Sequence, residues 1–140
     1  MTRNNINAQR NLGMKALDRD HDELSDQLGS LENTLQVSDY DAKDVEMAFV
    51  ELLGHIKGHF KREESWMRKV NYPGLRTHQK QHQILTGAIE EFLEAFTSDP
   101  TRDRGEDVYG LVENWLVDHT LNADRVIGGF IDYRRLIALQ

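Results

Sequence analysis

Residues 45–66 read VEMAFVELLGHIKGHFKREESW, and one stripe of this segment recurs at alternating steps of four and three. The stripe consists of Val45, Phe49, Leu52, Ile56, His59, Glu63 and Trp66. This period puts all seven side chains on one face of an α-helix and predicts an amphipathic helix packed against others. His59 and Glu63 belong to the stripe and not to the polar face. The segment therefore predicts a helix that carries two polar side chains into a core.

Three other segments have the same period. Their stripes are Met14, Leu17, His21, Leu24, Leu28, Leu31 and Leu35; then Leu75, His78, His82, Leu85, Ile89, Phe92 and Phe96; then Val108, Leu111, Val112, Trp115, Leu116 and His119. Both prolines lie between stripes, in Tyr72-Pro73-Gly74 and Ser98-Asp99-Pro100. We predict an all-α, up-down-up-down four-helix bundle with a short C-terminal helix over about residues 124–136. Ser38 with Asp41 resembles a capping box that would begin the second helix.

Length and composition narrow the class of protein. The 140 residues fit one domain, residues 1–140, with residues 1–12 as an N-terminal arm. No run reaches the roughly 18 apolar residues of a membrane span, and the polar start lacks a secretory signal. We therefore expect a cytoplasmic protein without membrane insertion. The absence of cysteine excludes thiolate metal sites, and the net charge of -7 argues against a nucleic-acid partner.

Five of the six histidines lie on the stripes, at His21, His59, His78, His82 and His119. One buried imidazole is usually a core residue with a hydrogen-bond partner, but five of them with Glu63 and Asp124 favour a metal cluster. The spacing of four residues puts His59 with Glu63, and His78 with His82, on one helix face each. His119 and Asp124 are five apart, so we expect a helix end, a π-bulge or a turn between Leu121 and Asp124 if both are ligands.

The donor types limit the metal. Seven ligands exceed one tetrahedral zinc, and calcium and magnesium prefer oxygen. Imidazole suits iron, copper, zinc and nickel, and two carboxylates suit a pair of metals that share bridging oxygens. The Glu-x-x-His pairs of ferritin-like di-iron bundles are missing.

Four sequence elements occur in the same order as in a known protein family. They are Gly13–His21 (GMKALDRDH), His59–Met67 (HFKREESWM), Tyr72-Pro73 with His78-x-x-x-His82, and Trp115–His119 (WLVDH) with Asp124. From about residue 13 to 133 the chain resembles the hemerythrins, specifically the single-domain bacterial ones.

The resemblance implies a hemerythrin-like bundle with two iron ions joined by an oxo or hydroxo bridge. It assigns His78, His82 and His119 to a coordinatively saturated iron, and His21 and His59 to an iron with an open position. Glu63 and Asp124 would bridge the two irons. The implied function is reversible O2 binding for carriage, storage or delivery, without enzymatic turnover.

Several residues surround these predicted ligands. Leu24, Ile56, Trp66, Trp115 and Leu116 each lie one helical turn from a ligand and are candidates for an O2 pocket, although the tryptophans also suit core packing. His55, one turn before His59, is either a partly exposed packing residue or a pocket residue able to protonate bound peroxide and speed autoxidation. We expect Lys61-Arg62 and Arg134-Arg135 to be solvated. Gly54, Gly58, Gly87 and Gly110 would mark close helix approach or a path for gas.

Two other function classes stay open. A di-iron redox enzyme, such as an oxidase, a peroxidase or a nitric-oxide-handling protein, is disfavoured by the histidine-rich ligand set. An iron storage or sensing protein is disfavoured because seven ligands on a packed bundle oppose easy release of metal. The protein partner and the oligomeric state also stay open, with a monomer as one option.

Overall fold

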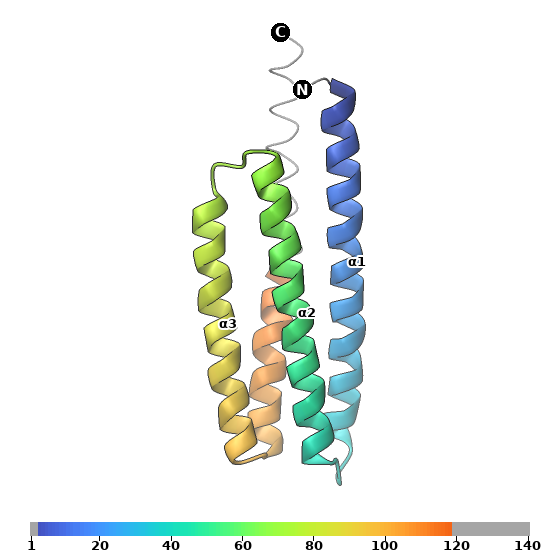
Figure 1. Cartoon of the computed structure of the whole chain (residues 1–140). Helices are drawn as coiled ribbons and strands as arrows, with labels where there is room; N and C mark the ends of the chain where they lie inside the picture. Colours follow the sequence, from blue (N-terminus) through green and yellow to red (C-terminus); the bar gives the residue numbers. More distant parts are fainter. Residues whose placement is uncertain (1–2, 119–140) are drawn as a thin grey trace.

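The computed structural model describes the backbone of residues 3–118 and the side chains of residues 19–118. Its helices are α1 (Arg3–Gln36), α2 (Ala42–Lys69) and α3 (Leu75–Ser98), followed by a helix of residues 102–118. Consecutive helices run antiparallel, and their connections alternate between the two ends of the molecule (Figure 1). The described residues contain no strand. The predicted all-α, up-down-up-down four-helix bundle is confirmed.

The ends of α2 follow from local chemistry. Asp41 is the N-cap, and its carboxylate accepts a hydrogen bond of 2.9 Å from the backbone N–H of Lys43. The prediction that Ser38 would begin this helix is therefore wrong by three residues. At the other end Asn71 takes a positive φ of 55°, a conformation that stops a helix and that Asn adopts more readily than most residues.

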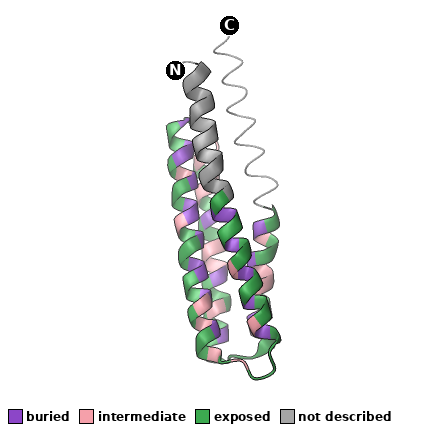
Figure 2. Ribbon diagram, turned by 90° about the vertical axis from the view of Figure 1, so that its right-hand side faces the viewer, coloured by how far each residue is buried: buried purple, intermediate pink, exposed green. Residues whose placement is uncertain are grey.

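The core lies where the stripes meet (Figure 2). All seven residues of the α2 stripe are buried, as predicted. In α3 the prediction is wrong at Phe92, which is 41% exposed, whereas Leu93 packs partly buried against the core. A step of three and a step of four from Ile89 both fit the helical period, and packing selects the second.

The helix of residues 102–118 is tied to the rest of the bundle at the end of the molecule that carries the α1–α2 connection. Tyr109 donates a 2.9 Å hydrogen bond to Glu32 of α1, and Tyr40 donates one of 2.8 Å to the carbonyl of Pro100. Gly105 is buried, and a Cβ built on it would lie 2.8 Å from Leu35 and 3.3 Å from Phe96. Close approach between helices therefore occurs at Gly105.

Of the two explanations offered for Gly54, Gly58, Gly87 and Gly110, close approach between helices is not found in the described part of the chain. A Cβ at Gly54, Gly87 or Gly110 would meet nothing within 4 Å there, and one at Gly58 would meet only Arg62 of its own helix.

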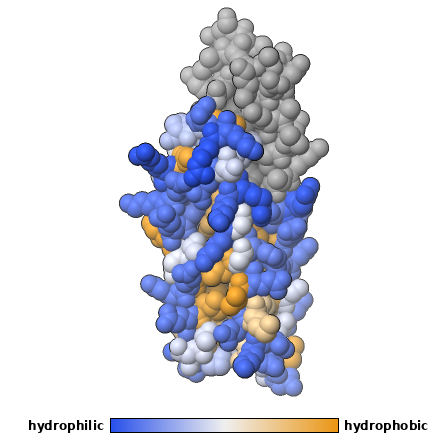
Figure 3. All heavy atoms as spheres, viewed as in Figure 1, coloured by the Kyte–Doolittle hydropathy of each residue, from blue (hydrophilic) through white to orange (hydrophobic). Residues whose placement is uncertain are grey.

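The surface is mainly hydrophilic, with a hydrophobic patch on the lower half of the face seen in Figure 3. Exposed large apolar side chains include Met47 and Val50 of α2 and Ile84 of α3. Between residues 3 and 118, no helix combines the length and the apolar character needed to cross a membrane.

Several predictions fall outside the described residues. These are the positions of His119 and Asp124, the irregularity between Leu121 and Asp124, the helix over residues 124–136, and the solvated pair Arg134-Arg135. Most of the segment expected to form an N-terminal arm, residues 3–12, is part of α1.

Replacing Gly54 and Gly105 by alanine should separate two effects: the cost of glycine inside a helix, and the need for space where helices approach closely. Gly54→Ala should raise the free energy of unfolding by about 0.5–1 kcal/mol, because Gly disfavours a helix interior and the site is open. Gly105→Ala should be less stable than Gly54→Ala by about 1 kcal/mol or more, since its Cβ overlaps Leu35. Urea unfolding of both variants at equal metal loading tests this. Equal increases in the free energy of unfolding for the two variants would contradict this prediction.

Candidate metal centre

Three helices bring five of the seven predicted ligands into the bundle. His21 comes from α1, His59 and Glu63 from α2, and His78 and His82 from α3. His59 and Glu63 are fully buried, His21 and His82 are each 6% exposed, and the His78 side chain is 17% exposed. Each pair on α2 and α3 is spaced by one helical turn, so both members face inward together. The other two predicted ligands, His119 and Asp124, lie outside the described residues.

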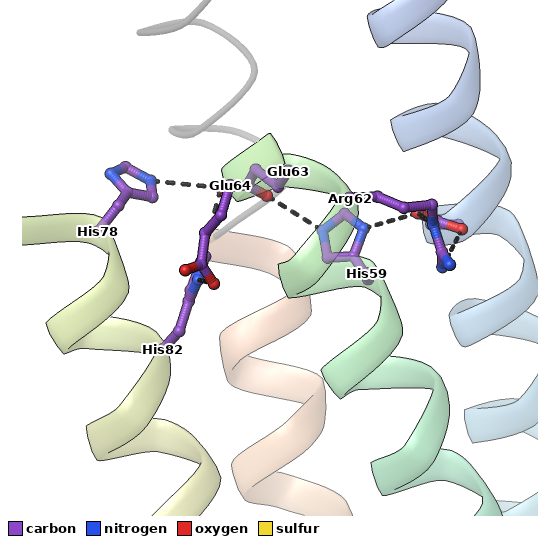
Figure 4. A network of polar contacts seen from close by, with 7 residues as sticks. His59, Arg62, Glu63, Glu64, His78 and His82 are labelled. Carbon is purple, nitrogen blue, oxygen red and sulfur yellow. Dashed lines mark hydrogen bonds and ion pairs between the residues drawn. The ribbon is translucent and has the colours of Figure 1, made fainter. Parts of the chain in front are cut away.

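The Glu63 carboxylate is the centre of this arrangement (Figure 4). Its Oε2 lies 3.2 Å from Nε2 of His59. Its Oε1 lies 3.5 Å from Nε2 of His78 and 3.6 Å from Nε2 of His82. The two oxygens thus face two different groups of imidazoles, one on the α1–α2 side and one on the α2–α3 side.

Each side contains a cluster of donors. Glu63, His78 and His82 each offer one ligand atom, and all three atoms lie within 4.8 Å of one another. On the other side the ring of His21 lies 5.0 Å from that of His59, measured between centroids. Imidazole nitrogens and a shared carboxylate suit a first-row transition metal on either side. The donor set therefore fits the predicted metal centre as far as the described residues extend.

Two further carboxylates orient His59 and His82 by binding the ring nitrogen that faces away from the centre. His59 donates from Nδ1 to Asp20 Oδ2 at 3.0 Å, and His82 donates from Nδ1 to Glu64 Oε2 at 3.1 Å. A carboxylate on the outer nitrogen fixes the tautomer and leaves Nε2 to face the centre. Arg62 in turn binds both oxygens of Asp20, at 2.8 and 2.7 Å.

The sequence did not indicate Asp20 and Glu64, nor the ion pair of Arg62. Arg62 is half exposed, as predicted for a solvated residue, and its guanidinium also pairs with a carboxylate from another helix. One signal could have identified them: Asp20 and Glu64 directly adjoin predicted ligands in the sequence.

Burial and charge act against each other at these groups. Burial, the largest influence, raises the pKa of Asp20, but the hydrogen bonds from Arg62 and His59 outweigh it and the net shift is downward. Burial also lowers the pKa of His59, but the carboxylates of Glu63 and Asp20 outweigh it and the net shift is upward. The metal-free site thus favours a positive charge on His59, and a metal cation would displace that proton.

The candidate pocket residues lie around the centre as follows. Leu24, Ile56, Trp66 and Leu116 are buried, and Trp115 is partly buried with its ring 6.2 Å from that of His59. Phe60 was not among the predicted pocket residues, but its ring stacks on His82 at 3.8 Å and meets Trp115 edge-on at 5.2 Å. Phe60 lies next to His59 but off the α2 stripe, which is why the period did not indicate it. His55 is exposed.

Comparison with known proteins gives a consistent match. The family model "Hemerythrin HHE cation binding domain" matches residues 12–131. A bacteriohemerythrin of Pseudomonas aeruginosa is 26% identical over 122 residues, which cover 87% of this chain and 75% of that protein. One of Clostridium acetobutylicum is 27% identical over 119 residues, covering 81% and 90%, and one of Methylococcus capsulatus is 29% identical over 77 residues, covering 55% and 58%. No solved structure gives a significant match.

Replacing Glu63 tests its position between the two donor clusters. Glu63→Gln keeps the shape of the side chain but removes its charge and replaces one of the two oxygens that face the imidazoles, so most of the bound metal should be lost. Glu64→Gln, the matched control, changes only a contact to the outer nitrogen of His82 and should weaken metal binding by roughly 10–100-fold without abolishing it. Metal content per chain after dialysis measures both. An unchanged metal content in Glu63→Gln would refute the central role.

Proposed function

Since the chain belongs to the hemerythrin family, we propose that it binds O2 reversibly at a di-iron centre. The observation that carries this proposal is the fully buried Glu63 carboxylate, with one oxygen toward His59 and the other toward His78 and His82. A carboxylate whose oxygens face separate imidazole groups suits a bridge between two cations. A single cation would not need donors on both sides.

The proposed ligand assignment follows the family pattern. His78 and His82 would hold one iron together with His119, and His21 and His59 would hold the other. Glu63 and Asp124 would contribute to both. The roles of His119 and Asp124 as ligands are inferred from their sequence positions alone. When bound, the two irons supply the electrons and the open coordination position that O2 requires.

The chain's own contribution would be apolar walls for a pocket at the centre. Leu24, Ile56 and Leu116 are nearly or fully buried near the ligands, and the rings of Trp115 and Phe60 lie against His59 and His82. Apolar walls exclude water and disfavour the escape of charged, reduced oxygen species. Such a pocket supports release of O2 as O2, which is what carriage, storage or delivery requires.

We propose binding without turnover, in the cytoplasm, as predicted from the sequence. Four of the five described ligands are imidazoles, and the two nearby carboxylates, Asp20 and Glu64, touch the outer nitrogens of histidines instead of the centre. O2-activating di-iron enzymes have ligand sets richer in carboxylate, so this arrangement favours a carrier over an oxidase or peroxidase.

The visible spectrum of the iron-loaded protein tests the proposal. The anaerobically reduced form should be nearly colourless, gain an absorption band on addition of O2, and lose it when O2 is removed. Glu63→Gln, prepared in the same way, should give no such band. A direct passage to the oxidised spectrum with no recoverable oxygenated form would refute reversible binding and favour a redox enzyme.

His55→Phe tests whether His55 acts in the pocket. Because His55 is exposed on α2, we expect the rate at which the oxygenated form oxidises to stay unchanged. Stopped-flow and slow absorbance measurements at constant pH would follow it. A clearly slower oxidation in the variant would mean that His55 delivers protons to the site.

A further inference from the structure

Asp20 and Arg62 form a contact that the ligand set does not require. The Asp20 side chain is 9% exposed and contacts both Nδ1 of His59 and the guanidinium of Arg62. Arg62 binds it in a bidentate manner, from Nε to Oδ2 at 2.8 Å and from Nη2 to Oδ1 at 2.7 Å. The two residues come from different helices, α1 and α2.

The local structure makes room for this pair. Gly58 lies one turn before Arg62, and a Cβ at Gly58 would be 3.3 Å from the nearer terminal nitrogen of the guanidinium. That spacing is tighter than ordinary van der Waals contact, so a side chain at residue 58 would crowd the guanidinium. The glycine leaves Arg62 free to lie along α2 and reach Asp20.

The pair acts on His59 in two ways. An imidazole has two ring nitrogens, so holding Nδ1–H on Asp20 directs Nε2 toward the centre. The negative charge of Asp20 also makes Nε2 a stronger electron donor. Arg62 opposes this second effect, because its positive charge lies against the two oxygens of Asp20 and partly neutralises their negative charge.

We propose that Asp20 and Arg62 are a positioning pair for His59, in which Asp20 orients and enriches the imidazole and Arg62 limits that enrichment. The inference rests on the metal centre of the proposed function. Glu64, on His82, makes no comparable contact with a guanidinium within residues 19–118. The pair therefore regulates one side of the centre and not the other.

The two residues should have opposite effects on the iron. A stronger donor stabilises the more oxidised metal, so loss of the Asp20 charge should raise the midpoint potential. Loss of the Arg62 charge should lower it. A pair that only held the helices together would not produce shifts of opposite sign.

The test uses the iron-loaded full chain and five variants. Asp20→Asn and Arg62→Met remove the two charges, and Asp22→Asn and Lys61→Met remove the same charges from exposed neighbours. Spectroelectrochemistry gives the midpoint potential, and competition with a chelator gives iron affinity. For Asp20→Asn we expect a higher midpoint potential and roughly 10–100-fold weaker iron binding. For Arg62→Met we expect a lower midpoint potential. Arg62→Lys should lie between Arg62→Met and the unaltered protein, because Lys supplies the charge without the bidentate geometry.

Shifts of the same sign in the two variants, or shifts no larger than those of the controls, would overturn the proposal. If Asp20→Asn does not fold, Arg62→Met still decides by the sign of its shift, since its side chain is half exposed. A second readout uses the metal-free protein, in which the His59 Nδ1 proton should give a downfield NMR signal that Asp20→Asn removes. Opposite shifts in a protein that fails to bind O2 reversibly would support the pair and refute only the proposed function.

Discussion

The buried charge of Glu63 is the constraint on which the rest of the structure depends. Transfer of an isolated carboxylate into a dry interior costs several kcal/mol even after relaxation. The side chain is nevertheless fully buried, and imidazoles of α2 and α3 lie within about 3.6 Å of its oxygens. These helices must keep the register that maintains those contacts. In the metal-free chain the raised pKa of His59 favours a proton that compensates this charge, and cations do so when they are bound, so metal binding and folding are coupled.

The bundle tolerates this polar cluster because its other half is apolar. Leu31, Leu35, Phe49, Phe96 and Val108 are buried toward the end that carries the α1–α2 connection. Hydrogen bonds from Tyr109 to Glu32 and from Tyr40 to Pro100 join the elements at that same end. The apolar half thus contributes to holding the helices together apart from the polar cluster. Geometry at the centre is then set by the scaffold, which favours a preformed site.

The features that depend on the helical period could be predicted from the sequence, whereas those that depend on contacts between helices could not. The α2 stripe and the inward-facing His59 and Glu63 follow from a spacing that only one helix face satisfies. Phe92 and Leu93 fit the period equally well, so only the neighbouring helices could choose between them. Asp20 and Arg62 are 42 residues apart, and each alone looks like a solvated charge. Their pairing depends on how α1 and α2 pack, which no local pattern contains.

The surroundings of the centre make its two sides different before any metal is considered. On the α1–α2 side the carboxylate behind His59 is neutralised by a bidentate guanidinium. On the α2–α3 side Glu64 stands behind His82 without such a partner among the described residues, and the ring of Phe60 covers that histidine instead. His82 therefore receives the full effect of its carboxylate, whereas His59 receives a reduced one. Two chemically similar histidines thus acquire unequal donor strength from residues that lie outside the centre.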